Sequence, residues 1–165
     1  MGGDAQALAL DAAWGGVDVR VNNAGIDGPR TLSWDSDLTA WGKVIDIIFS
    51  VHERIAWSGY NACTASKAGL SMLSQTLAQE AGPFGVRVPC IAPGAVRTPI
   101  NTGVWEGPWG MSDLLTKIPL GCTGEVGDIA GLAVLMASDA AGYVTATTLF
   151  ADGGMTNYPG FMHGG

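Results

Sequence analysis

Three side chains between residues 50 and 67 carry the groups best suited to chemistry in this chain. Ser50 offers a hydroxyl, Cys63 a thiol and Lys67 an ammonium group. Cys63 and Lys67 are four residues apart, so on a helix they project from the same face. A lysine beside a thiol can lower the pKa of that thiol. Ser50 ends an apolar run thirteen residues before Cys63, which places its hydroxyl just before the loop that leads to this helix.

The element that positions Cys63 and Lys67 is a helix expected over residues 61–79. Apolar and small residues recur from Ala62 to Leu77 at a spacing near 3.6, which is typical of a helix. Gly82 and Pro83 stop the pattern. We therefore expect the long helix of the chain here, with a loop between it and Ser50.

The remaining pattern alternates strands and helices. Glu125 and Asp128 place acidic groups at the start of one helix, where they favour its N-terminus. The expected strands are residues 17–21, 86–92 and 147–151, the expected helices are 4–14 and 126–138, and a long loop over 95–124 contains a short helix at 113–116. Alternation of this kind predicts an α/β fold with roughly four parallel strands covered by helices, a truncated doubly wound sheet.

Composition excludes several classes of function. The chain has 165 residues, a length that suits a single domain, and a net charge of -7, which disfavours nucleic acid and anionic membranes as partners. No apolar run approaches the roughly 20 residues of a membrane span, and the N-terminus lacks the pattern of a signal peptide. The three cysteines form no C-x-x-C pair, so we expect no metal site and no disulfide framework. These features predict a cytoplasmic protein.

Four motifs, in order along the chain, resemble those of the short-chain dehydrogenase/reductase family. They are V-N-N-A-G at 21–25, T-A-S-K-A-G at 64–69, A-P-G-A-V-R-T-P at 92–99 and A-D-G-G at 151–154. The local sequences at 50–57 and 148–161 are most similar to those of the glucose 1-dehydrogenase branch. The resemblance implies a Rossmann-like fold and transfer of a hydride between a sugar or another alcohol and NAD or NADP.

The resemblance also implies roles for residues at the matching positions. Ser50 is expected to bind the substrate oxygen. Lys67 is expected to bind the nicotinamide ribose and to lower the pKa of the neighbouring acid. Cys63 occupies the position of the proton donor and acceptor, which is a tyrosine in the family.

The implied cofactor contacts come from two further motifs. Asn23, Ala24 and Gly25 are expected to line the adenosine side, where small residues allow close backbone approach. The nicotinamide and its carboxamide are expected to lie against residues after the strand at 86–92, namely Pro93, Gly94 and Thr98.

Cys63 is the first departure from the family pattern. A tyrosine hydroxyl lies several ångströms farther from the backbone than a cysteine sulfur, so the thiol is expected to miss the substrate oxygen. Tyr60 is seven residues before Lys67, about 10 Å along the axis if the segment is helical throughout. It is therefore not expected to replace the missing tyrosine.

Two more departures concern segments rather than single residues. No glycine-rich turn follows a strand, so residues 1–165 are expected to form one incomplete dinucleotide-binding domain that lacks its N-terminal βαβ unit. The stretch between Asp46 and Ser50 is too short for the family's helix, which also carries the subunit interface and the active-site asparagine. A homo-oligomer would be weakened accordingly. Pro89 interrupts an expected strand.

These departures leave the activity open. The first expectation is an oxidoreductase with impaired activity that acts on a sugar or alcohol; the alternative is a non-catalytic pseudoenzyme or fragment that associates with intact relatives. A thiol enzyme using Cys63 is a weaker alternative. His52 and His163 are expected on the surface. Three residues of the long loop form either a substrate lid or a local packing cluster: Trp105, Trp109 and Met111. The sequence does not identify the substrate, and it does not distinguish NAD from NADP.

Overall fold

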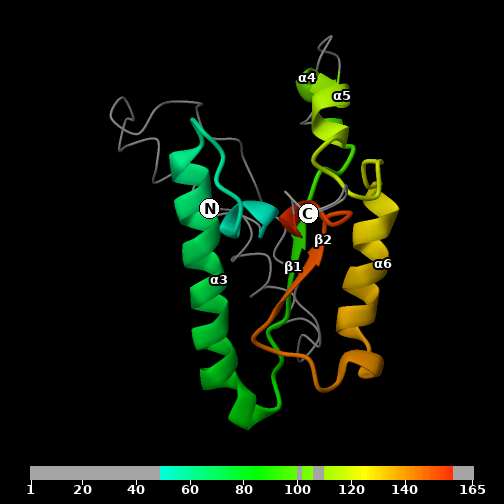
Figure 1. Cartoon of the computed structure of the whole chain (residues 1–165). Helices are drawn as coiled ribbons and strands as arrows, with labels where there is room; N and C mark the ends of the chain where they lie inside the picture. Colours follow the sequence, from blue (N-terminus) through cyan, green and yellow to red (C-terminus); the bar gives the residue numbers. More distant parts are fainter. Residues whose placement is uncertain (1–48, 100–101, 106–109, 158–165) are drawn as a thin grey trace, which may run out of the picture.

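A parallel pair of short strands lies at the centre of the part of the chain that the structure describes. The computed structural model describes residues 49–99, 102–105 and 110–157. Strand β1 (Cys90–Pro93) pairs with β2 (Thr148–Ala151), with Cys90 opposite Thr148 and Pro93 opposite Ala151. Helix α3 lies on one side of this pair and α6 on the other (Figure 1). The expected class, a parallel sheet covered by helices, is confirmed for this part of the chain.

The long helix that carries Cys63 and Lys67 is confirmed. Helix α3 spans Asn61–Ala81 and passes directly into a 3-10 turn, η3 (Gly82–Phe84). The chain then turns at Gly85, whose φ of 75° favours glycine because a side chain is strained there. The predicted stop at Gly82 and Pro83 is therefore correct, and the helix runs two residues beyond the predicted Gln79.

The buried face of α3 differs from the one that the apolar pattern suggests. Leu73 and Leu77, two members of that pattern, are 52% and 43% exposed. The buried side chains are small or polar and follow a spacing of three to four: Ala62, Ser66, Lys67, Ser74 and Ala78. Small side chains let the helix backbone approach its neighbours closely, so hydrophobicity alone does not identify the inner face.

Helix α6 (Val126–Ala137) begins with a reciprocal capping box. The Glu125 side chain accepts from the backbone of the first turn, and the Asp128 carboxylate accepts from the Glu125 backbone N–H at 2.7 Å. Two otherwise unpaired N–H groups are satisfied in this way. The expected acidic start of this helix is confirmed.

Arg87 caps the other end of α6. Its guanidinium donates to the carbonyl oxygens of Met136 at 2.9 Å, Ala141 at 3.0 Å and Ser138 at 3.3 Å. The last carbonyls of a helix have no partner within the helix and attract positive charge. A single side chain just before β1 thereby holds the C-terminal end of α6 and the following 3-10 turn η5 (Asp139–Ala141) against the strand.

Strand β1 begins later than predicted, at Cys90 rather than at Val86. Val88 and Cys90 make the contacts toward β2: the Ala146 N–H donates to the Val88 carbonyl, and the Cys90 N–H donates to the Thr147 carbonyl. Bonds in a parallel pair come from alternate residues. Pro89 falls between them, so its missing N–H removes no bond to β2.

The segment after β1 has more structure than the single loop with one short helix that the sequence suggests. It contains α4 (Thr102–Trp105) and α5 (Gly110–Leu115), so the predicted short helix exists but starts earlier. A parallel bridge between Val96 and Gly124 closes the base of the segment. The chain ends its described part in a last 3-10 turn, η6 (Met155–Asn157).

The predictions for residues 1–48, including the strand at 17–21 and the helix at 4–14, fall outside the described residues. Across the part of the chain that is described, no helix combines the length and the apolar character needed to cross a membrane.

Arg87 provides a first test of this architecture. Arg87→Met keeps much of the side-chain length but leaves the α6 carbonyls without their donors, so we expect a loss of about 1–3 kcal/mol in the free energy of unfolding. Urea denaturation followed by circular dichroism measures it. The matched control is Arg97→Met, because Arg97 is exposed, pairs with Glu125 at 3.8 Å and donates an exposed hydrogen bond to Thr123 at 3.1 Å; we expect about 0.5 kcal/mol or less there. Equal losses in both variants would contradict the capping role.

Candidate functional site

Ser50 starts a short turn beside α3. Its backbone is extended, with φ −160° and ψ 160°, and it caps the 3-10 helix η2 (Val51–Glu53). The Ser50 Oγ accepts from the backbone N–H of His52 at 3.4 Å, a long contact. Val51 is 2% exposed and anchors the turn, which packs against α3. The expected hydroxyl before a loop is therefore present, and no pairing of Phe49 or Ser50 with a strand occurs among the described residues.

Lys67 is buried, with 6% of its surface exposed, although it lies on a helix that could have turned it to solvent. Lys67 is therefore not a solvated lysine on the helix surface. Its positive charge acts on His52 and contributes to lowering the pKa of that imidazole. The fold thus brings the Lys67 charge, from α3, within electrostatic range of His52 on the turn that Ser50 begins.

His52 is half-buried, so the prediction that it lies on the surface is wrong. Its Nδ1 lies 3.2 Å from the Ile55 carbonyl oxygen, and its ring stacks on Trp57 with centroids 4.7 Å apart. Burial lowers the pKa of the imidazole most; the Ile55 hydrogen bond opposes this effect, and the Lys67 charge adds to it. The histidine is therefore kept neutral to lower pH than an exposed histidine.

Tyr60 joins the same group of rings. It is the residue that caps α3, with φ −116° and ψ 40°, so the segment before Asn61 is not helical and the expected axial separation of Tyr60 from Lys67 does not apply. Its ring stacks on Trp57 at 4.0 Å. A continuous stack His52–Trp57–Tyr60 therefore runs along the loop between Ser50 and α3, and periodicity could not have predicted it.

Cys63 lies one turn into α3 and is half-buried. Its carbonyl accepts from the Ser66 Oγ at 2.7 Å. The other two thiols differ from it: Cys122 is exposed, and Cys90 is buried in β1, where burial raises the pKa of its thiol.

Gly94 is held by the neighbouring strand. A Cβ at this position would lie 2.7 Å from both the Cα and the Cβ of Asp152, which is closer than atoms can approach. The Gly94 N–H also donates to the Ala151 carbonyl at 3.0 Å. The Asp152 carboxylate in turn accepts from the backbone N–H groups of Gly154 and Thr156, at 2.8 and 2.7 Å. Packing at the ends of β1 and β2 thus accounts for both the glycine and the acidic residue of two sequence motifs.

Thr98 has a different character. Its Oγ1 is buried and has no hydrogen-bond partner within the described ranges. A buried hydroxyl without a partner costs free energy, so it marks a place where a ligand can supply one. Pro93 and Gly94, at and just after the end of β1, lead into the segment that carries it. Asn23, Ala24 and Gly25 lie outside the described residues.

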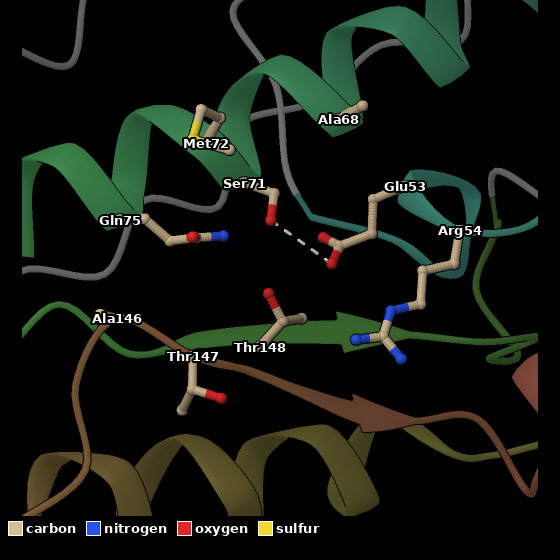
Figure 2. Close-up of a pocket in the computed structure, with 9 residues that line it drawn as sticks. All are labelled: Glu53, Arg54, Ala68, Ser71, Met72, Gln75, Ala146, Thr147 and Thr148. Carbon is tan, nitrogen blue, oxygen red and sulfur yellow. Dashed lines mark hydrogen bonds between the residues drawn. The ribbon is translucent and has the colours of Figure 1, made fainter.

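A polar cavity of about 400 Å³ opens between α3 and the start of β2 (Figure 2). Glu53 and Arg54 project into it from the turn after Ser50, facing Ser71 and Thr148. The Ser71 hydroxyl lies 3.5 Å from Glu53 Oε1, and the Arg54 guanidinium lies 4.5 Å from the centre of the Phe150 ring. Sequence patterns did not indicate this cavity, because its polar residues come from three separate segments.

Burial raises the pKa of Glu53; the hydroxyls of Thr148 and Ser71 and the charge of Arg54 oppose this effect. No group of three or more histidine, cysteine, aspartate or glutamate side chains suited to a metal ion occurs in the described part of the molecule.

Known proteins share the sequence of this chain over most of its length. The chain matches the family described as Enoyl-(Acyl carrier protein) reductase over residues 38–156. It is 41% identical to 3beta-hydroxysteroid dehydrogenase 1 of Eggerthella lenta, with 98% of this chain and 72% of that protein covered. The chain belongs to the short-chain dehydrogenase/reductase family. The predicted family is confirmed.

Two further relatives define the fold and the cofactor class. The chain is 34% identical to glucose 1-dehydrogenase 2 of Bacillus subtilis, over 93% of this chain and 70% of that protein. The solved structure of 4-hydroxyisoleucine dehydrogenase with NADH superposes with a TM-score of 0.86 at 25% identity, covering 93% of this chain and 74% of that one. These matches confirm the Rossmann-like doubly wound α/β fold, and homologues in this family use NAD or NADP.

Gly94 allows a direct test of strand packing. Gly94→Ala places a Cβ against the Asp152 backbone, so the strand ends must separate, and we expect a loss of about 1–3 kcal/mol in the free energy of unfolding. Gly131→Ala in α6 is the control: a Cβ there meets nothing within 4 Å, and we expect a gain of about 0.5–1 kcal/mol. Thermal denaturation of both variants measures the two effects. A Gly94→Ala variant as stable as the unsubstituted protein would contradict the close approach.

The raised pKa of Glu53 predicts that the stability of the fold depends on pH. Because its folded pKa is raised, this group favours folding fully below the unfolded pKa of 4.5, and the contribution is lost as pH rises through the folded pKa. Glu53→Gln has no charge to bury, so its stability relative to the unsubstituted protein should increase from pH 4.5 to pH 7. Urea denaturation at both values measures this change. The exposed Glu80→Gln serves as control, and a difference for Glu53→Gln that did not change with pH would contradict the burial effect.

Proposed function

We propose that this protein is a dehydrogenase that oxidises a hydroxyl group of a sugar or another alcohol with NAD or NADP. The observation that carries the proposal is the buried Lys67 ammonium beside the Ser50 turn, because the family's chemistry needs a hydroxyl and a positive charge together. The names of two relatives give glucose and a 3beta-hydroxysteroid as substrates, and both serve as first test compounds.

In the proposed reaction, Ser50 and Lys67 have separate roles where substrate and nicotinamide meet. In this proposal the Ser50 hydroxyl holds the substrate oxygen by a hydrogen bond. The Lys67 ammonium, being buried, acts through a low-dielectric surrounding, so its charge lowers the pKa of a nearby acid more than an exposed lysine would. We assign to it, in addition, a hydrogen bond to a ribose hydroxyl of the cofactor.

The residues after β1 fit the nicotinamide end of the cofactor. The Thr98 Oγ1 is a buried hydroxyl without a partner in the described residues, and a carboxamide can accept or donate at such a group. The cofactor, when bound, supplies the acceptor for a hydride. The chain supplies the hydroxyl of Thr98, the backbone after Pro93, and the charge of Lys67 to bind and orient it.

Cys63 limits the rate in this proposal. The thiol is several ångströms shorter in reach than the tyrosine of the family, so it does not serve as the efficient proton acceptor that its relatives possess. We therefore propose weak activity compared with relatives that keep the tyrosine.

Restoring the tyrosine tests this proposal. We expect Cys63→Tyr to raise kcat/KM for glucose or the 3beta-hydroxysteroid by about 10²-fold or more, within the range typical of acid–base catalysis. Appearance of NAD(P)H absorbance measures turnover, and isothermal titration calorimetry measures NAD and NADP binding to both proteins. Cys122→Tyr, at an exposed cysteine, is the control and should not change the rate.

A second candidate follows from the same residue. A chain with Cys63 in place of the tyrosine could associate with intact relatives without catalysing the reaction itself, and a homo-oligomer belongs to the same proposal. If neither protein binds NAD or NADP and neither turns over substrate, the dehydrogenase proposal is wrong and this candidate stands. Size in solution, with and without a full-length relative, then measures the association.

A further inference from the structure

We propose that His52 replaces the missing tyrosine as the proton acceptor of the reaction. The inference rests on the proposed dehydrogenase function and deepens it by naming the group that moves the proton. It starts from two observations: the backbone N–H of His52 contacts the Ser50 Oγ at 3.4 Å, and the Lys67 charge acts on the His52 imidazole.

The hydrogen bond to Ile55 decides which ring nitrogen carries the proton. A carbonyl oxygen can only accept, so the nitrogen that contacts it at 3.2 Å, Nδ1, must donate. In the neutral imidazole the other nitrogen, Nε2, then carries the lone pair. Stacking on Trp57 fixes the plane of the ring, so Nε2 has a defined direction. This combination of a held Nδ1–H and a basic Nε2 is the arrangement of a general base.

Burial and the Lys67 charge favour the neutral form of the His52 imidazole, which can accept a proton. Burial, with Lys67 from α3 as a second cause, lowers the pKa of His52, so the ring is neutral near pH 7 and able to accept a proton. The charged neighbours on the turn itself are Glu53 and Arg54, and Tyr60 adds a titratable hydroxyl from the start of α3. After proton transfer the Lys67 charge disfavours the imidazolium, which promotes release of the proton to solvent.

In the oxidising direction the substrate O–H bond breaks and its proton moves to His52 Nε2. The neighbouring C–H bond breaks and its electron pair leaves as hydride to NAD or NADP, the oxidant. The substrate C–O bond becomes a carbonyl, and the imidazolium returns its proton to water. Ser50 holds the substrate oxygen throughout.

His52→Gln tests the role, because glutamine keeps hydrogen-bonding groups but accepts no proton at neutral pH. We expect kcat/KM for oxidation to fall by about 10²-fold or more. His163→Gln is the matched control, since the chain has only these two histidines, and it should leave the rate unchanged.

A double-mutant comparison separates proton transfer from a structural role. In a Cys63→Tyr background the tyrosine supplies its own proton path, so the cost of His52→Gln should shrink to about 10-fold or less. A histidine that only held the Ser50 turn in place would cost the same factor in both backgrounds. Equal factors would overturn the inference while leaving the proposed dehydrogenase in place.

Nuclear magnetic resonance provides a measurement without turnover. The ¹⁵N shifts of the two histidines, assigned with His163→Gln, should show the Nδ1–H form of His52 at pH 7 and a pKa below 6.5. An Nε2–H form, or a pKa above 6.5, would overturn the inference. If the unsubstituted protein neither binds NAD or NADP nor oxidises either test alcohol, the proposed function fails first, and the role of His52 fails with it.

Discussion

The parallel pairing of β1 with β2 is the constraint on which the rest of the structure depends. It fixes where the loops after both strands emerge, and it brings Gly94 so close to Asp152 that no side chain fits between them. The turn at Asp152 and the segment that carries Thr98 both start from this point. Arg87, just before β1, then ties the far end of α6 to the same strand. The position of a site after β1 therefore depends on the pairing of these two four-residue strands.

The second requirement of the site is a buried positive charge. Removing an ammonium group from water costs several kcal/mol unless polar groups compensate it, and the inner face of α3 is unusual in presenting small and polar side chains around Lys67. A helix selected only for packing would bury its leucines there instead. The face is thus organised for placement of a charge beside the Ser50 turn.

The sequence predicted the elements of this protein better than their faces or loops. Helix α3, helix α6 and strand β2 follow from local patterns, because periodicity, stop signals and acidic caps act over a few residues. The inner face of α3 did not follow, since Leu73 and Leu77 are exposed while Ser66 and Lys67 are buried. Which face of α3 is buried depends on how closely the helix approaches its neighbours, and the spacing of apolar residues contains no information on that distance.

The loop between Ser50 and α3 illustrates a different limit. His52, Trp57 and Tyr60 have no regular spacing, yet their rings form one stack because the chain reverses between them. Tyr60 lies two helical turns from Lys67 only if the helix includes it, and α3 begins at Asn61. Four family motifs identified the fold and the cofactor class, but the motifs alone could not distinguish their structural from their functional residues. Gly94 and Asp152 are explained by packing, whereas the buried hydroxyl of Thr98 is not.

The contact of Arg87 with the end of α6 also bears on how the chain acquires its structure. The carbonyls that it binds belong to residues 49 and 54 positions later in the sequence, and β1 must likewise wait for β2, which follows α6. Helix α3 can form from local interactions, but closing such long loops loses chain entropy before any strand contact compensates it. Among the described elements, the pairing of β1 with β2 therefore depends on closing a long loop, and until that loop closes, the edges of both strands are open to pairing with another molecule.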